Sequence, residues 1–133
     1  MTLLLSSYEL FMKLGFFTAA LPNNTLEQAA QWGAESGFKA IEIACWPLET
    51  ATRRYAGVTH INVAELDKPQ ATEICKMLDG YGLMISSLGY YPNPLHPDTE
   101  YRETVITHLK KVIEAAEMLE VPTVTRRVKP FIY

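Results

Sequence analysis

The chain has little of what marks several large classes of protein. It has only two cysteines, Cys45 and Cys75, which lie far apart without metal-type spacing. We interpret them as reduced, partly buried thiols of a cytosolic protein. The start, MTLLLSSYELF, has no basic residue ahead of its short apolar run, and no other run approaches the length of a membrane span. These absences predict a soluble, cytoplasmic protein without a membrane partner.

Positive charge is also scarce. The 12 Lys and Arg residues are outnumbered by 15 Asp and Glu residues, which gives a formal net charge of -3. A surface that follows nucleic-acid phosphates needs clustered basic side chains, so no nucleic-acid partner is expected. Two short basic pairs, Arg53-Arg54 and Arg126-Arg127, are more typical of solvated surface than of a phosphate site.

Known catalytic motifs are missing as well. The sequence has no Gly-rich phosphate loop, nucleophile elbow, Walker motif or zinc-ligand spacing. The motifs therefore leave the catalytic residues unknown, and no residue is predicted to bind a metal.

What the sequence does contain is the composition of a folded domain and a regular alternation of elements. Of its 133 residues, 48% are hydrophobic and 20% are charged. Short apolar runs predict four strands at residues 13–18, 39–45, 83–89 and 121–125. A helical pattern separates each strand from the next.

The helices have clear start signals. Thr25 and Gln28 form a capping box for a helix that extends to about residue 36 and is closed by Gly37. Asp67 is the predicted N-cap of a second helix that ends near residues 80–82, and Asp98 is the N-cap of the longest helix. The predicted inner stripes are Leu26, Ala29, Ala30 and Gly33 in the first helix, Ala71, Ile74, Cys75 and Leu78 in the second, and Val105, Leu109, Val112, Ala116 and Leu119 in the third.

Alternating strands and helices predict an α/β fold with a parallel sheet and right-handed crossovers. This pattern does not give the order of the strands. An open doubly wound sheet and part of a (β/α)₈ barrel are both compatible with it. After the fourth strand, the residues RRVKPFIY show no helical pattern.

Several segments, taken in order, resemble a known family. They are MKLGFFTAALPNNTLEQAAQWGAESGFKAIEIACWP, RYAGVTHINV, ISSLGYYPNPLHPD and LEVPTV. Together they are similar to the N-terminal half of the sugar phosphate isomerase/epimerase family, which are xylose isomerase-like TIM barrels related in fold to ketose epimerases and apurinic endonucleases. A TIM barrel needs eight strands and about 250 residues, so the resemblance implies a partial barrel with about four of the eight strands. Residues 1–12 are then an N-terminal extension, 13–125 the half-barrel and 126–133 an atypical tail.

The resemblance also implies where the chemistry lies. In this family, Glu, Asp and His side chains on later strands hold a divalent metal (Mn²⁺ or Mg²⁺), and paired glutamates there move the proton. These strands correspond to sequence beyond residue 133, so no metal or proton-transfer residue can be assigned here and no metal is expected on this chain. A truncated or frame-shifted reading frame and a deliberate fragment both remain open explanations.

In a TIM barrel the reactive groups lie at the carboxyl ends of the strands and in the loops that follow. Aromatic rings there suit the C–H faces of sugars, whereas Asn and His can hydrogen-bond to hydroxyl groups. Plain loop packing is the alternative for these side chains. The candidate substrate-binding residues are Phe17, Glu42, Trp46, His60, Tyr90, Tyr91, Asn93 and His96.

Glu42 is the most informative carboxylate. It alternates with Ile41 and Ile43, so it faces the barrel interior if the isoleucines face the helices. A buried carboxylate is costly unless it is paired. A role in ordering the site and an ion pair with Lys13 are both compatible with this position. His108, in contrast, is predicted to be solvated, off the apolar stripe of the third helix.

Three hypotheses of function follow. In the first, the full-length relative isomerises or epimerises a keto-sugar or its phosphate by metal-assisted proton transfer, and this chain alone is inactive. In the second, the chain is a non-catalytic half-barrel that self-associates, with a homodimer completing the eight strands. In the third, it is an apurinic endonuclease-like DNA repair protein, against which the acidic balance counts.

Overall fold

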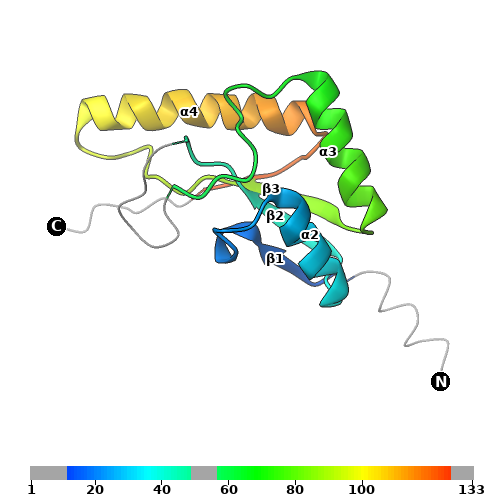
Figure 1. The fold of residues 1–133 in the computed structure, drawn as a ribbon. Helices are drawn as coiled ribbons and strands as arrows, with labels where there is room; N and C mark the ends of the chain where they lie inside the picture. The colour runs from blue at the N-terminus through cyan, green and yellow to red at the C-terminus, as the bar shows by residue number, and fades with distance from the viewer. Residues whose placement is uncertain (1–11, 49–56, 127–133) are drawn as a thin grey trace.

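A parallel sheet of four strands organises the chain (Figure 1). The computed structural model describes residues 12–48 and 57–126. Its elements are β1 (Gly15–Phe17), the 3₁₀ helix η1 (Thr18–Ala20), α2 (Leu26–Glu35), β2 (Ala40–Ala44), α3 (Lys68–Gly80), β3 (Met84–Gly89), α4 (Thr99–Met118) and β4 (Val124–Thr125). Residues 1–11 of the predicted extension, the Arg53-Arg54 pair, and Arg127 with the rest of the tail lie outside the described residues. The predicted division of the chain at residues 13 and 125 stays a prediction.

The strand order settles the question that the sequence left open. The order is β1-β2-β3-β4, and each strand pairs in parallel with the one before it in the chain. A doubly wound sheet reverses its order at a switch point, whereas a barrel wall adds its strands one after another. The fold is therefore α/β with the sheet of a partial barrel. The carboxyl ends of all four strands lie at one edge.

Local capping signals set the helix starts. The side chain of Thr25 accepts a hydrogen bond from the Gln28 amide at 3.2 Å, and Gln28 returns the bond, so the predicted capping box is confirmed. Gly37 follows with a positive φ of 87°, which favours glycine and ends the helical path. At the start of α4, Asp98 accepts from the Tyr101 amide at 2.8 Å.

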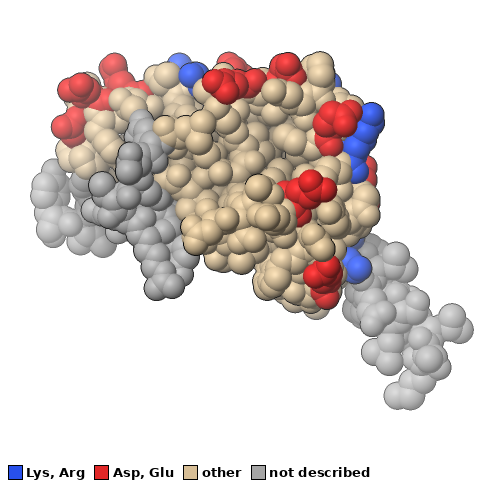
Figure 2. All heavy atoms as spheres, viewed as in Figure 1, with Lys and Arg blue, Asp and Glu red and all other residues tan. Residues whose placement is uncertain are grey.

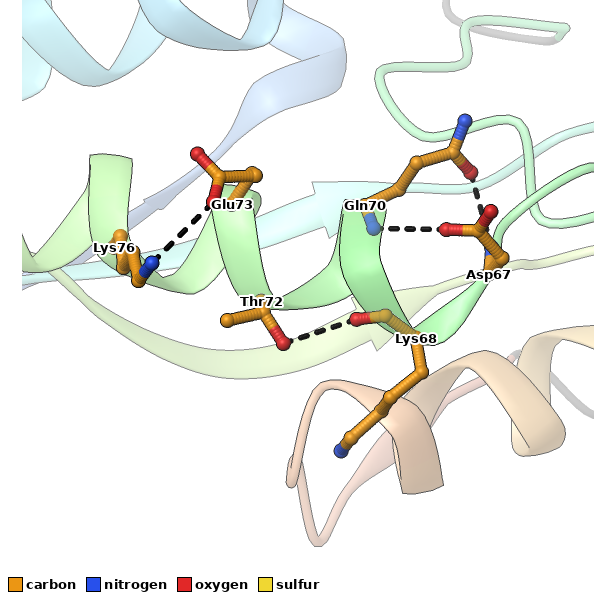
Figure 3. Close-up of polar contacts among 6 residues, drawn as sticks. All are labelled: Asp67, Lys68, Gln70, Thr72, Glu73 and Lys76. Carbon is orange, nitrogen blue, oxygen red and sulfur yellow. Dashed lines mark hydrogen bonds and ion pairs between the residues drawn. The ribbon is translucent and has the colours of Figure 1, made fainter.

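The start of α3 is equally well defined (Figure 3). Asp67 accepts from the Gln70 amide at 2.8 Å, and the Gln70 side chain accepts from the Asp67 amide at 3.0 Å. One turn further on, the Lys76 ammonium group lies 3.4 Å from the Glu73 carboxylate in an exposed pair. Such an exposed pair adds little stability, so the cap is the stronger of the two signals.

The core lies between the sheet and the three α-helices. Ile41 and Ile43 of β2 and Leu88 of β3 are fully buried, and they pack in one cluster with apolar residues of the helices. The helical members of that cluster are Leu26, Ala30, Ala71, Leu78, Val105, Val112, Ala115 and Ala116. The isoleucines thus face the helices, and the intervening Glu42 points to the opposite face of the sheet, as predicted.

Small residues bring α2 close to the sheet. A Cβ atom on Gly33 would lie 2.3 Å from the ring of Phe16 on β1, so only glycine allows this approach. The Phe16 ring also contacts Trp32 and Phe38, with centroid separations of 5.3 and 5.0 Å. Phe16 therefore belongs to the helix face. Its neighbour Phe17 faces the other side of the sheet.

All four strands are shorter than predicted, and β1 and β4 are shortened most. β1 ends at Phe17 because the chain turns into η1, where the buried Thr18 hydroxyl accepts a hydrogen bond from the Ala44 amide at 2.9 Å. β4 begins only at Val124, because the amide of Val121 is used to close α4 on Ala116 at 2.8 Å. In both cases a hydrogen bond to a neighbouring element replaces a strand pair.

The surface of the helical side carries mixed charge. On the face seen in Figure 2, acidic side chains are scattered over the helices and a few basic side chains lie between them. Among the helices of the described residues, none combines the length and apolar character that crossing a bilayer would require.

Candidate functional site at the carboxyl ends of the strands

Four aromatic side chains gather where β1, β2 and β3 end. The ring centroids of Phe17 and Tyr91 are 5.3 Å apart, and those of Trp46 and Tyr91 are 5.5 Å apart, both in edge-to-face geometry. Trp46 also lies 6.2 Å from Phe17 and 5.8 Å from Tyr90. We call Phe17, Trp46, Tyr90 and Tyr91 the aromatic cluster. The sequence predicted all four at this edge of the sheet, and the structure brings them together.

Glu42 lies under this cluster on the inner face of the sheet. It pairs in register with Phe17 of β1, so the two side chains emerge on the same side. The carboxylate is partly buried, and its Oε1 atom accepts a hydrogen bond from the hydroxyl of Tyr91. The expected ion pair with Lys13 is wrong. Lys13 is exposed at the opposite end of β1, two residues before Gly15, which pairs with Ala40.

Gly89 is a site residue that sequence reasoning missed. A Cβ atom at this position would lie 2.7 Å from Oε1 of Glu42 and 2.8 Å from Cε2 of Phe17. The carboxylate and the ring therefore lie directly against the backbone at the end of β3. A glycine within a predicted strand often marks such a close approach, and this signal was available in the sequence.

The surroundings keep the hydroxyl of Tyr91 protonated. Burial, the hydrogen bond to Glu42 and the negative charge of Glu42 all raise the pKa of Tyr91. The phenol is thus a hydrogen-bond donor throughout the neutral pH range. The second carboxylate oxygen of Glu42, Oε2, receives no hydrogen bond from the described residues. It can accept one from a hydroxyl group of a ligand.

His60 ties two loops together. Its Nε2 atom lies 3.2 Å from the carbonyl of Leu21, which can only accept, so Nε2 carries the proton. Its Nδ1 atom is buried, without a partner among the described residues, and burial lowers the pKa of the ring. The backbone next to it pairs with the end of β2, through His60 to Ala44 at 2.9 Å and the bridge from Thr59 to Cys45. Its observed contacts anchor this loop, and its role in substrate binding stays a prediction.

Asn93 and His96 order the loop before α4. The Asn93 side chain accepts from the Leu95 amide at 3.1 Å, and His96 Nδ1 accepts from the Asp98 amide at 3.2 Å. The His96 ring also packs against Tyr101, with centroids 4.6 Å apart. The observed contacts of both residues are thus with their own loop and the start of α4.

His108 was predicted to be solvated, and this is wrong. Its Nε2 donates to the Cys45 carbonyl at 2.8 Å, and its ring lies 4.6 Å from the Tyr90 ring. The residue is three positions after Val105 and four before Val112, both buried, so the helical spacing already placed it on the inner face. His108 thereby packs against Tyr90 from α4, on the helical side of the sheet.

Metal binding and thiol chemistry find no support in this part of the chain. Within residues 12–48 and 57–126, no three His, Cys, Asp or Glu side chains lie close enough to hold a metal ion. Proteins hold Mn²⁺ and Mg²⁺ through side chains that converge on one point, so the described residues do not fit a metal centre. Both cysteines are free, as predicted, and burial raises the pKa of the Cys45 thiol to about 12.

Comparisons with known proteins agree with this geometry. A family model described as xylose isomerase-like TIM barrel matches residues 30–130. Among solved structures, a D-psicose 3-epimerase in the presence of D-fructose superposes with a TM-score of 0.61 at 17% identity, over 86% of this chain and 37% of that one. A D-psicose 3-epimerase with D-tagatose from Clostridium cellulolyticum H10 gives 0.61 at 20% identity, over 86% and 37% of the two chains.

A third structure shares the fold but is that of a probable dehydratase. It is the probable 3-DHS dehydratase AsbF involved in petrobactin synthesis from Bacillus anthracis, with a TM-score of 0.59 at 14% identity over 86% of this chain and 38% of that one. No curated protein matches the sequence. The match covers well under half the length of each of these three solved structures.

Proposed function

The chain belongs to the xylose isomerase-like TIM barrel family, and we propose that it forms part of the substrate-binding mouth of a sugar isomerase or epimerase. The observation that carries this proposal is the aromatic cluster over Glu42, at the carboxyl ends of consecutive parallel strands. TIM-barrel enzymes bind their substrates at this end of the barrel. Together, the aromatic cluster and Glu42 combine apolar ring faces with one carboxylate.

The chemistry of these groups suits the ring faces and hydroxyl groups of a keto-sugar. The C–H faces of a sugar pack on aromatic rings such as Trp46 and Phe17, while its hydroxyl groups need hydrogen-bond partners. Oε2 of Glu42 offers an acceptor beside the rings. The similar D-psicose 3-epimerase structures, one in the presence of D-fructose and one with D-tagatose, support ketoses as the first ligands to test.

The reaction itself needs residues beyond those described. Isomerisation and epimerisation of a keto-sugar both move a proton on a carbon next to the carbonyl, and a divalent metal such as Mn²⁺ or Mg²⁺ would polarise that carbonyl in the complete barrel. No described cluster of the chain provides the metal ligands. We therefore expect the isolated 133-residue chain to bind sugar without converting it. The predicted cytoplasmic location belongs to the same proposal.

Two experiments test this function. Saturation-transfer NMR with D-fructose should show transfer to the sugar, and Trp46→Ala should abolish it, while Trp32→Ala on α2 serves as the matched control. Absence of transfer to any ketose would contradict the binding proposal. Turnover of ketoses with Mn²⁺ or Mg²⁺, abolished by EDTA, would instead contradict the expected inactivity of the isolated chain.

Self-association is a second candidate, favoured by the open edges of the sheet. β1 and β4 each have one strand neighbour among the described residues. Unpaired strand edges promote association, and two copies related by a two-fold axis can complete eight strands. The half-barrel homodimer remains a proposal.

A further inference from the structure

We propose that Glu42 is a positioning residue, which holds the ring of Tyr91 through its hydrogen bond and so fixes the aromatic cluster in the arrangement that receives a sugar. This inference rests on the proposed function and goes further, because it assigns Glu42 a role through Tyr91. Three features of the structure lead to it.

The first feature is the connection that the hydrogen bond makes. Glu42 lies in the middle of β2, and Tyr91 lies two residues beyond the end of β3, so the bond joins a strand to a loop. The edge-to-face contacts of the Tyr91 ring with Phe17 and Trp46 have interplanar angles of 73° and 65°. The hydrogen bond to Glu42 thus holds the hydroxyl of Tyr91, while the contacts with Phe17 and Trp46 hold its ring. Without the bond, only ring contacts would orient it.

The second feature is the register of β2 and β3. Ile41 pairs with Ile85, but the next residue, Glu42, pairs with Ser87, so Ser86 is an extra residue. Continuous pairing would have matched Glu42 with Ser86 and turned each later residue of β3 to the opposite face. The irregularity places Leu88 in the core and Gly89 on the inner face beside Glu42.

The third feature is the space that this register creates. The Glu42 carboxylate occupies the volume where a side chain at position 89 would begin, because Oε1 lies 2.7 Å from an ideal Cβ there. The Cε2 atom of Phe17 is nearly as close to that ideal Cβ, at 2.8 Å. Gly89 therefore admits both groups, and the strand irregularity and the glycine act together to seat the carboxylate beneath the rings.

The test combines three variants of this pair. Tyr91→Phe keeps the ring and removes the hydroxyl, whereas Glu42→Leu removes the acceptor at similar size. Glu42→Gln keeps one acceptor oxygen for the Tyr91 hydroxyl and should weaken sugar binding less than Glu42→Leu does. Loss of one hydrogen bond to a charged group corresponds to a weakening of D-fructose binding by about fivefold or more in each of the first two variants.

The double variant Glu42→Leu/Tyr91→Phe gives the decisive comparison. If Glu42 acts through Tyr91, the double variant binds D-fructose no more weakly than Glu42→Leu alone. The inference would be overturned if the loss of D-fructose affinity in the double variant equalled the product of the losses in the two single variants. It would also be overturned if Tyr91→Phe bound D-fructose like the wild type. The matched control is Tyr81→Phe, which removes a similar bond from Tyr81 to Glu27 (3.2 Å) on the helical side and should leave binding unchanged.

A measurement without sugar separates this inference from the proposed function. Near-ultraviolet circular dichroism reports the packing of the aromatic cluster in the free protein. A change in the tryptophan band of both Tyr91→Phe and Glu42→Leu, absent from Glu42→Gln, supports the positioning role even if no sugar binds, because Trp46 contacts Tyr91 and is kept in every variant. Unchanged spectra in Glu42→Leu would overturn it.

Discussion

At the scale of single residues, the phenol of Tyr91 makes stability depend on alkaline pH. Its pKa is raised above the ordinary value of 10.0 by burial, by the hydrogen bond to Glu42 and by the charge of Glu42. The folded state thus holds this proton more tightly than the unfolded state does. Linkage requires that the resulting stability is complete below pH 10.0 and is lost as pH rises from there through the raised pKa.

We therefore expect the free energy of unfolding to fall above pH 10.0, and to fall less in Tyr91→Phe. Urea denaturation at several pH values from 8 to about 11 measures both slopes. Parallel pH profiles for the two proteins would contradict the role given to this hydroxyl.

The two thiols should differ in reactivity. Cys45 is fully buried, and burial raises its pKa to about 12, whereas Cys75 is partly exposed at α3. Because the thiolate is the reacting species, Cys45 should stay unmodified in the native protein. A thiol reagent such as DTNB at pH 8 should modify Cys75 first, and Cys75→Ala should remove the fast reaction. Fast modification that persists in Cys75→Ala would show that Cys45 is accessible.

Single residues are also where sequence reasoning was weakest. The aromatic cluster could be predicted, because each member lies within two residues of the carboxyl end of a strand. The partner of Glu42 could not, since the Tyr91 hydroxyl reaches it only through the strand irregularity at Ser86. Gly89, a glycine within a strand, did carry a sequence signal of close approach, but the groups that approach it come from β1 and β2 and are identified only by the structure.

At the scale of elements, the packing of α2 on the sheet depends on one glycine. A methyl group at Gly33 would meet the Phe16 ring at 2.3 Å, whereas one at Gly80 of α3 meets nothing within 4 Å. Gly33→Ala should destabilise the protein by about 1–3 kcal/mol through overpacking. Gly80→Ala should stabilise it by about 0.4–1 kcal/mol, because alanine restricts the unfolded chain.

Chemical denaturation of the two variants measures this difference. The substitution is the same, and only the space around it differs. Equal effects on the free energy of unfolding would show that the contact between Gly33 and Phe16 does not control the packing of α2.

Helix starts were predictable and strand lengths were not. The caps at Thr25, Asp67 and Asp98 are contacts within three residues, so the sequence contains the whole signal. The ends of β1 and β4 depend instead on partners from other elements, such as the Ala44 amide that Thr18 binds. Such partners are visible only after folding.

At the scale of the whole molecule, the sheet formed by residues 12–48 and 57–126 has two open edges. The sequence predicted the parallel strands and, through family resemblance, a partial barrel, while the order β1-β2-β3-β4 required the structure. If the edges of β1 and β4 pair between copies, the apparent mass should rise with concentration to that of a dimer. Multi-angle light scattering over a range of concentrations measures this, and a monomer throughout the range would contradict the half-barrel homodimer.

The central claim is that the aromatic cluster binds a sugar, and a fluorescence titration tests it most directly. The chain has two tryptophans, so Trp32→Phe leaves Trp46 as the single tryptophan reporter. Trp32 lies on α2 against Phe16 and Phe38, away from the aromatic cluster. Titrating this variant with D-fructose should change the Trp46 emission saturably, with a Kd in the millimolar range, about -4 kcal/mol, as expected for part of a site. An emission that stays unchanged up to high D-fructose, D-psicose and D-tagatose would contradict the account.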